Sequence, residues 1–167
     1  MSGLDVVVYA SGTASLGRVS ELTASDWTRM LATNLVGAAL VVRHALPALR
    51  SAENGTIALL STHTVGNPWP SLVAYAASKA ALEELARGLR VEEPTVRVLS
   101  IKVGDTSTPF ADNWNPTRFE EALTGWFEEG LMRYRVMGAD EVAELVLRAV
   151  VDRDGPVEML VRGEEES

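Results

Sequence analysis

Residues 55–79, GTIALLSTHTVGNPWPSLVAYAASK, contain a strand pattern followed by a helix pattern. The run 57–60 is short and apolar and ends in hydroxyl residues, which is typical of a buried parallel strand. Segment 67–70 contains two prolines, and a proline disfavours helical backbone in the residue before it. From Ser71 the sequence is rich in Ala and Leu, which favour a helix. The stretch therefore predicts a strand, a loop and a helix in succession.

Tyr75 and Lys79 lie four residues apart on this predicted helix, so their side chains project from one face. An ammonium group near a phenol favours the phenolate and lowers its pKa, which would let the tyrosine exchange a proton near neutral pH. The pattern is short, and by itself it more often marks a solvated helix face. However, the chain has only three Tyr and two Lys, so a chance pair at this spacing is uncommon.

The run Tyr75-Ala-Ala-Ser-Lys79, followed by Ala-Ala-Leu, resembles the active-site helix of the short-chain dehydrogenase/reductase family. That family places its catalytic serine thirteen residues before the tyrosine and seven residues after the glycine that precedes the strand. Both counts, from Tyr75 and from Gly55, lead to Thr62. Ser61 stands next to it and stays open as the alternative hydroxyl, because the loop that follows is unlike the family's usual loop.

The resemblance assigns roles to the site residues. Tyr75 is implied as the acid/base, Lys79 as its electrostatic aid and ribose contact, and Thr62 or Ser61 as the clamp on the substrate oxygen. Asn34 is the one polar residue in the apolar middle of its segment. It matches the family's asparagine, where distorted helix backbone holds a water of the proton relay. The alternative for Asn34 is a solvated or back-bonded side chain.

A nicotinamide cofactor, NAD or NADP, is implied by the same resemblance. Besides Tyr75 and Lys79, the positions that match its contacts are Gly12 after the first strand, Gly104 after a later strand, and Thr108, four residues beyond that glycine. The family's glycine-rich phosphate turn, which holds the pyrophosphate, has no counterpart in this sequence. We therefore expect this chain by itself to bind the cofactor poorly.

Composition narrows the function classes. The 167 residues carry a net charge of −8, which disfavours nucleic acid and anionic membranes as partners. There is no cysteine, and the two histidines do not form a metal cluster, so we expect no metal site. We expect no membrane-spanning segment and a cytoplasmic location.

The predicted order of elements alternates strands and helices, which indicates an α/β fold with a Rossmann-like parallel sheet and flanking helices. About four strands are expected, in one partial catalytic domain over residues 1–163, truncated at its N-terminal side relative to the family. The first predicted strand, residues 4–10, would then have an open edge. Residues 109–137 are rich in aromatic side chains, and either ordinary packing or a substrate lid would account for them. Residues 164–167 form an acidic tail that we expect to be disordered.

Three functional hypotheses follow. The first is an oxidoreductase that acts on a small carbonyl or alcohol substrate. The second is a non-catalytic oligomer or scaffold, and the third is a fragment of a longer reductase. For the first two we expect a homo-oligomer, formed through the helices at residues 26–49 and 71–92, because these combine apolar and small-residue faces.

Overall fold

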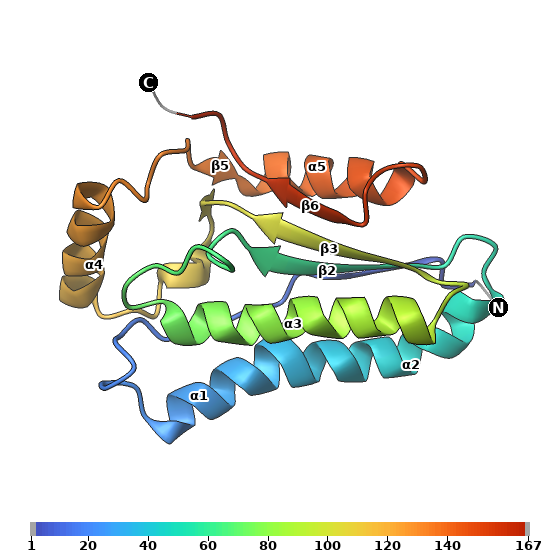
Figure 1. Cartoon of the computed structure of the whole chain (residues 1–167), viewed down its shortest axis with the longest axis horizontal. Helices are drawn as coiled ribbons and strands as arrows, with labels where there is room; N and C mark the ends of the chain where they lie inside the picture. The colour runs from blue at the N-terminus through green and yellow to red at the C-terminus, as the bar shows by residue number, and fades with distance from the viewer. Residues whose placement is uncertain (1–2, 166–167) are drawn as a thin grey trace.

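The computed structural model describes residues 3–165 (Figure 1). Its main strands and helices alternate along the chain as the sequence predicted. In order, the elements are β1 (Val6–Tyr9), α1 (Ala24–Leu31), η1 (Ala32–Gly37), α2 (Ala38–Ser51), β2 (Thr56–Thr62), α3 (Val73–Glu92), β3 (Arg97–Val103), β4 (Thr106–Ser107), η2 (Pro109–Ala111), α4 (Pro116–Glu128), β5 (Met137–Gly138), α5 (Ala139–Val151) and β6 (Glu158–Val161).

Four strands form one parallel sheet in the order β1-β2-β3-β6. The helices that connect them cross over on the two faces, as parallel strands require. Figure 1 shows α1, α2 and α3 below the sheet and α5 above it. The prediction of an α/β fold with a parallel sheet of about four strands is confirmed.

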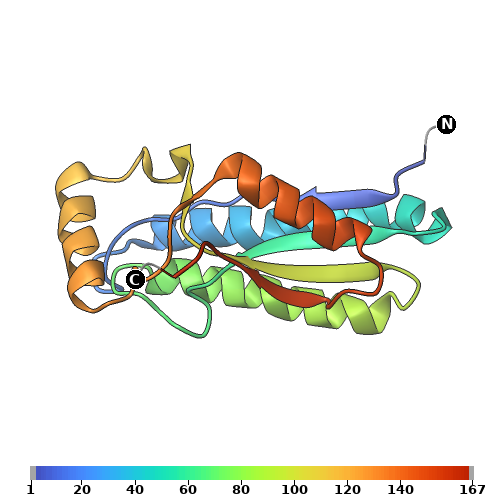
Figure 2. The ribbon, with the colours of Figure 1, turned by 90° about the horizontal axis from the view of Figure 1, so that it is seen from above.

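Each face of the sheet has its own apolar core. On the α2 and α3 face, side chains from β2 and β3 pack against both helices; the central members are Val42, Leu49, Ile57, Leu82 and Val98. On the other face, α5 covers parts of β2, β3 and β6; the central members are Ala58, Leu99, Ile101, Val146 and Val161. Figure 2 shows that α4 stands at one end of the molecule, beyond the ends of the strands of the sheet. The sheet is therefore enclosed by helices around β2 and β3.

Strand β1 is enclosed less completely. Within the described residues it pairs only with β2. Val7 packs into the α2 and α3 core, whereas Val6 and Val8 on the other face stay 39% and 46% exposed. The open edge expected for the first strand is thus present in the structure.

Helices α1 and α2 are joined through η1 into one continuous helical segment. Thr23 caps its start with a capping box to Asp26, which satisfies backbone groups that the first turn leaves free. The combined helix Ala24–Ser51 is long and apolar enough to cross a membrane by length and composition alone, contrary to the expectation that no segment would be. In this structure one side of it packs on the sheet through Val42 and Leu49.

Three features differ from the sequence analysis. The short parallel pair of β4 and β5, and the 3-10 turn η2, were not predicted. Two-residue strands carry no alternating pattern, which explains why they were missed. The acidic tail is not wholly free, because the carbonyl of Glu164 accepts a hydrogen bond from the backbone N–H of Arg135. The rest of the tail expectation, at 166–167, lies outside the described residues.

Candidate active site

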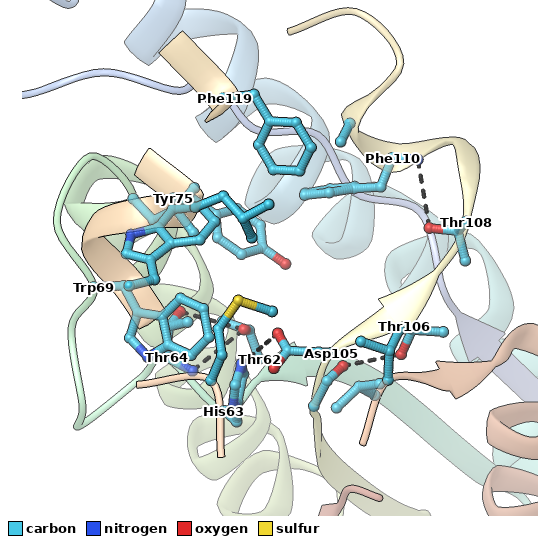
Figure 3. Close-up of a pocket in the computed structure, with 18 of the residues that line it drawn as sticks. Thr62, His63, Thr64, Trp69, Tyr75, Asp105, Thr106, Thr108, Phe110 and Phe119 are labelled. Atoms are coloured by element: carbon cyan, nitrogen blue, oxygen red, sulfur yellow. Dashed lines mark hydrogen bonds and ion pairs between the residues drawn. The ribbon is translucent and has the colours of Figure 1, made fainter. Parts of the chain in front are cut away.

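A cavity of about 310 Å³ opens where β2 and β3 end and α3 begins. Its floor contains the hydroxyl residues at the end of β2 and the segment that follows β3. Its walls come from α3, η2 and α4. Figure 3 shows the aromatic side chains of Trp69, Tyr75, Phe110 and Phe119 around this space. The carboxyl end of a parallel sheet is where such folds place their ligands.

The two candidate hydroxyls at the end of β2 have different surroundings. Ser61 donates a hydrogen bond of 2.5 Å from Oγ to Oε1 of buried Glu83, and Lys102 Nζ lies 3.6 Å from the other carboxylate oxygen. Thr62 Oγ1 lies 3.2 Å from Thr64 Oγ1 and accepts from the Thr64 N–H at 3.3 Å. The Ser61 hydroxyl is therefore already bound to Glu83, while the Thr62 hydroxyl contacts the hydroxyl and the N–H of Thr64 at the cavity floor.

Tyr75 is the third residue of α3, and its ring points into the cavity (Figure 3). Burial raises the pKa of Tyr75 to about 12, and the Thr62 hydroxyl acts in the opposite direction. The sequence analysis expected the nearby ammonium to lower this pKa below 10. That expectation is wrong for this structure, because the phenolate would be formed in a largely dry, aromatic environment.

Lys79 is 3% exposed and its Nζ donates to the backbone carbonyl of Leu60 at 2.8 Å. Burial lowers the pKa of Lys79 to about 8. Gly12 approaches this ammonium closely, since a Cβ at that position would lie 3.2 Å from Nζ. The glycine after β1 therefore leaves room beside Lys79 that a larger residue would fill.

Asn34 is completely buried within η1, a π-helical segment of six residues. Its amide clamps the peptide of Thr13, because Oδ1 accepts from the Thr13 N–H at 2.8 Å and Nδ2 donates to the Thr13 carbonyl at 2.9 Å. Nδ2 also donates to Ser78 Oγ at 2.8 Å. The alternative of a solvated asparagine is excluded, and the helix around Asn34 is distorted as the resemblance implied. Asn34 thus joins the loop after β1 to α3.

Gly104 and Thr108 follow β3 and both line the cavity. Gly104 packs against the end of β6, where a Cβ would lie 2.9 Å from Cβ of Arg162. Close packing therefore accounts for a glycine at this position without any contact to a cofactor. Thr108 caps η2 through its side chain, and Oγ1 accepts from the Phe110 N–H at 3.4 Å.

Some side chains of residues 109–137 pack against other parts of the fold, and some line the cavity. Trp126 is buried and its Nε1 donates to the Pro70 carbonyl, while Trp114 Nε1 donates to the Ala14 carbonyl. The Phe110 ring lies tilted against the Tyr75 ring, with 5.4 Å between the two centroids. Some side chains of this segment thus pack against neighbouring segments and others line the cavity, and the substrate lid stays a prediction.

Sequence reasoning missed a contact between a histidine and a carboxylate in the cavity. His63 Nε2 lies 3.3 Å from Asp105 Oδ1, and the His63 ring meets Trp69 edge-on at 4.9 Å. The two residues are 42 positions apart in the chain and meet because β2 and β3 are neighbours. The only signal was that His63 directly follows β2 and that Asp105 lies two residues after the end of β3. In the part of the chain that the structure describes, no group of three acidic or histidine side chains could hold a metal.

Comparisons with known proteins agree with this geometry. The family model for short chain dehydrogenase matches residues 1–118. The chain is 36% identical over 112 residues to an uncharacterized NAD-dependent oxidoreductase from Mycobacterium tuberculosis, covering 65% of this chain and 41% of that protein. It is 28% identical over 151 residues to 2,3-dihydro-2,3-dihydroxybenzoate dehydrogenase from Escherichia coli, covering 86% of this chain and 61% of that protein.

Solved structures share the fold. An alcohol dehydrogenase from the archaeon Thermococcus sibiricus, complexed with 5-hydroxy-NADP, superposes with a TM-score of 0.78 at 23% identity, over 99% of this chain and 65% of the other. A small-chain dehydrogenase in complex with NADPH gives 0.79 at 21% identity, over 95% and 72%. The chain spans 49%, 51% and 61% of the first curated relatives that it matches. With the family model matching most of its length, the chain belongs to the short-chain dehydrogenase family.

Proposed function

We propose that this chain carries the catalytic half of an NAD(P)-dependent oxidoreductase that interconverts a small carbonyl compound and its alcohol in the cytoplasm. The observation that carries the proposal is the placement of Tyr75 and Thr62 at one cavity, with Lys79 buried behind them. A cavity with apolar walls and a few polar groups suits a small organic substrate.

The proposed chemistry follows from the protonation states. With a pKa raised to about 12, Tyr75 is a phenol at neutral pH and therefore a proton donor. The substrate oxygen would accept hydrogen bonds from the Tyr75 hydroxyl and from Thr62 Oγ1. Tyr75 would then give its proton to that oxygen as the carbonyl becomes an alcohol, and would take the proton back in the reverse direction. Ser61 has no direct part, because its hydroxyl already donates to Glu83.

The residues present fit the nicotinamide end of a dinucleotide. Gly12 leaves space beside the Lys79 ammonium, and Thr108 and Gly104 border the same cavity. Lys79 would contact the ribose, and Thr108 the nicotinamide amide. When bound, the cofactor supplies or takes up the hydride. NAD and NADP differ at the adenosine end, so the choice between them is made there.

Asn34 would act as a positioning residue. Its hydrogen bonds to Thr13 and Ser78 hold the loop after β1 against α3, next to the turn that carries Tyr75. The π-helical backbone around Asn34 is the site where a relay water would bind. Replacing its amide would loosen both the floor under Tyr75 and the position of Gly12.

Matched variants test the proposal in a preparation that reduces a panel of carbonyl compounds with NADH or NADPH and oxidises the corresponding alcohols with NAD+ or NADP+. Tyr75→Phe removes the proton donor and should lower turnover by about 10²–10⁴-fold with the fold intact. Thr62→Val should lower it strongly as well, whereas Ser61→Ala should have a small effect. Near-normal turnover in Tyr75→Phe would contradict the proposal. A larger loss of turnover in Ser61→Ala than in Thr62→Val would assign the substrate-binding hydroxyl to Ser61 instead of Thr62.

One observation favours a second function. The bare edge of β1, with Val6 and Val8 exposed, would suit a non-catalytic module that assembles through this strand. A chain that never turns over any substrate of the panel, but associates in a way that Val8→Lys abolishes, would support this alternative over catalysis.

A further inference from the structure

We propose that the Asp105–His63 pair is a substrate-recognition subsite that accepts a hydrogen bond from a donor group of the substrate, a hydroxyl or an ammonium, a few bonds from the reacting carbon. The proposal names a substrate class: hydroxy- or amino-substituted carbonyl compounds, and the corresponding diols or amino alcohols. It rests on the proposed function for one point only, which is that the reacting oxygen lies between Tyr75 and Thr62.

The pair is held rigidly at the floor of the cavity. The His63 N–H donates to the Val103 carbonyl at 3.0 Å, and the Met137 N–H donates to the Asp105 carbonyl at 2.9 Å. The backbone of both residues is thereby tied to neighbouring strands. His63 Nε2 lies 3.3 Å from Asp105 Oδ1, so one carboxylate oxygen is already partnered. A site on fixed strand ends positions a ligand more accurately than one on a free loop.

The second carboxylate oxygen is the unusual feature. Asp105 Oδ2 is buried and has no hydrogen-bond partner among the described residues. Buried polar atoms are nearly always hydrogen-bonded, and an unmet carboxylate oxygen costs free energy. Trp69 Nε1, on a cavity wall beside His63, is unpartnered as well. Both residues line one cavity, and the unpartnered acceptor of Asp105 is the group that we take a bound molecule to complete.

The remaining surroundings define what that molecule is. Figure 3 shows the Asp105 carboxylate below the Tyr75 ring, with Thr62 on one side and Thr106 on the other, and with aromatic side chains to the left and above. The walls include Trp69, Phe110 and Phe119, so the body of the substrate would be apolar. A carboxylate accepts hydrogen bonds and does not donate them, so it selects O–H or N–H and repels an anionic substituent. Polar groups in an otherwise apolar pocket are the ones that set specificity.

The test is a binding measurement that needs no turnover. Acetophenone, α-hydroxyacetophenone, α-aminoacetophenone and α-methoxyacetophenone are titrated against the chain by ligand-observed NMR. The hydroxy or the amino compound should bind about ten-fold or more tightly than the methoxy compound, because a hydrogen bond to a charged group has that effect on affinity. The hydroxy and amino compounds separate a neutral donor from a cationic one. Phenylglyoxylate, the anionic probe, should bind more weakly than acetophenone.

Two variants assign the preference to the carboxylate. Asp105→Asn keeps the shape of the side chain and should reduce the ratio of the affinities for the donor compounds and the methoxy compound several-fold. Asp105→Ala should bring this affinity ratio close to one. Phe110→Leu is the matched control, because it removes wall area without a polar group and should weaken all probes while keeping the ratio. For the Asp105 variants, unchanged binding of acetophenone and an unchanged circular dichroism spectrum show that the variant is folded, and for Phe110→Leu the unchanged spectrum shows it.

Equal affinity for the hydroxy, amino and methoxy compounds in the parent chain would overturn the inference, and so would a ratio that survives in Asp105→Asn. If Asp105→Ala does not fold, the parent ratio and Asp105→Asn decide by themselves. Failure here is distinct from failure of the proposed function. A donor preference that depends on Asp105, in a chain whose Tyr75→Phe variant keeps full turnover, would support the subsite and reject the proton donor.

Discussion

Strands β2 and β1 are neighbours in one sheet, yet β2 is enclosed by helices on both faces, whereas β1 is partly exposed to solvent. Six of the seven residues of β2 are buried, between α2 and α3 on one face and α5 on the other. None of the four residues of β1 is buried. The proposed catalytic groups Thr62, Tyr75 and Lys79 all belong to β2 or to α3, which packs on it. Gly12, the proposed cofactor contact, instead follows the bare strand.

This difference indicates where the site is preorganised. Lys79 is tied to the carbonyl of Leu60 and Ser61 to Glu83, so the end of β2 and the face of α3 hold each other in place. The segment after β1 is positioned by side chains from other elements, among them Asn34 with its two hydrogen bonds to Thr13 and Trp114 with its hydrogen bond to Ala14. We therefore expect the catalytic side of the site to keep its geometry under changes that alter the cofactor side.

The largest expected effect is on stability. Leu82 is completely buried between the sheet and α3, so Leu82→Ala should lower the free energy of unfolding by about 2–5 kcal/mol. Val8→Thr, on the bare face of β1, should change it by no more than about 0.5 kcal/mol. Urea denaturation of both variants measures the two values. Similar losses in the two would mean that β1 is enclosed in solution, and the comparison would fail.

The pH dependence of stability sharpens the comparison on the enclosed side. The folded pKa of Lys79 is about 8 and its ordinary value is 10.5, so the unfolded chain binds more protons in between. Stability from this group should therefore rise as the pH rises from about 8 to 10.5, by up to about 3 kcal/mol. Urea denaturation across this window, with Lys79→Met as the reference, isolates the contribution. A difference between parent and variant that does not change with pH would contradict the burial of a titrating ammonium.

Tyr75 gives the opposite sign in a higher window. Its folded pKa of about 12 lies above the ordinary value of 10.0, so the unfolded chain ionises first. Stability should fall as the pH rises from 10 to 12, and the Tyr75→Phe variant should lack this part of the fall. The absorbance change of phenolate formation, compared between the parent and Tyr75→Phe, reports the same pKa directly. If Tyr75 ionised below pH 10, the expectation from the sequence that Lys79 lowers the pKa of Tyr75 would be right after all.

Association through the helices gives a smaller change, in mass rather than stability. Leu40 on α2 is 48% exposed, and Ala81 lies on α3. If the chain pairs through these helices, Leu40→Arg and Ala81→Arg should shift the light-scattering mass toward monomer. Leu147→Arg, at a 62% exposed leucine of α5, is the matched control and should leave the mass unchanged. A parent that is already monomeric would reject this interface.

The sequence predicted the elements that carry the site residues better than it predicted the contacts and pKa values of those residues. The β2 strand, the α3 helix and the spacing of Tyr75 and Lys79 are local patterns, and the structure contains all of them. The surroundings of Ser61 depend on Glu83, which reaches it from the next helix, and no pattern around Ser61 reveals that contact. The His63–Asp105 pair likewise forms between two strands.

The pKa of Tyr75 was predicted in the wrong direction for the same reason. The spacing to Lys79 is readable in the sequence, whereas the depth of burial depends on how α4 and η2 close the cavity. Short elements such as β4 and β5 have too few residues for a periodic pattern and form because neighbouring segments are already placed. Contacts between distant segments are thus what the sequence could not supply.

The central claim is that this chain builds the catalytic and nicotinamide side of the site and little of the rest. Calorimetric titration with NADH, NADPH and reduced nicotinamide mononucleotide tests it most directly. If only Gly12, Lys79, Gly104 and Thr108 contribute, the three ligands should bind within about three-fold of one another, and all more weakly than micromolar. Lys79→Met should weaken all three alike. A micromolar dissociation constant for NADH or NADPH, with a much weaker one for the mononucleotide, would show that the chain holds the adenosine end as well and would contradict the account.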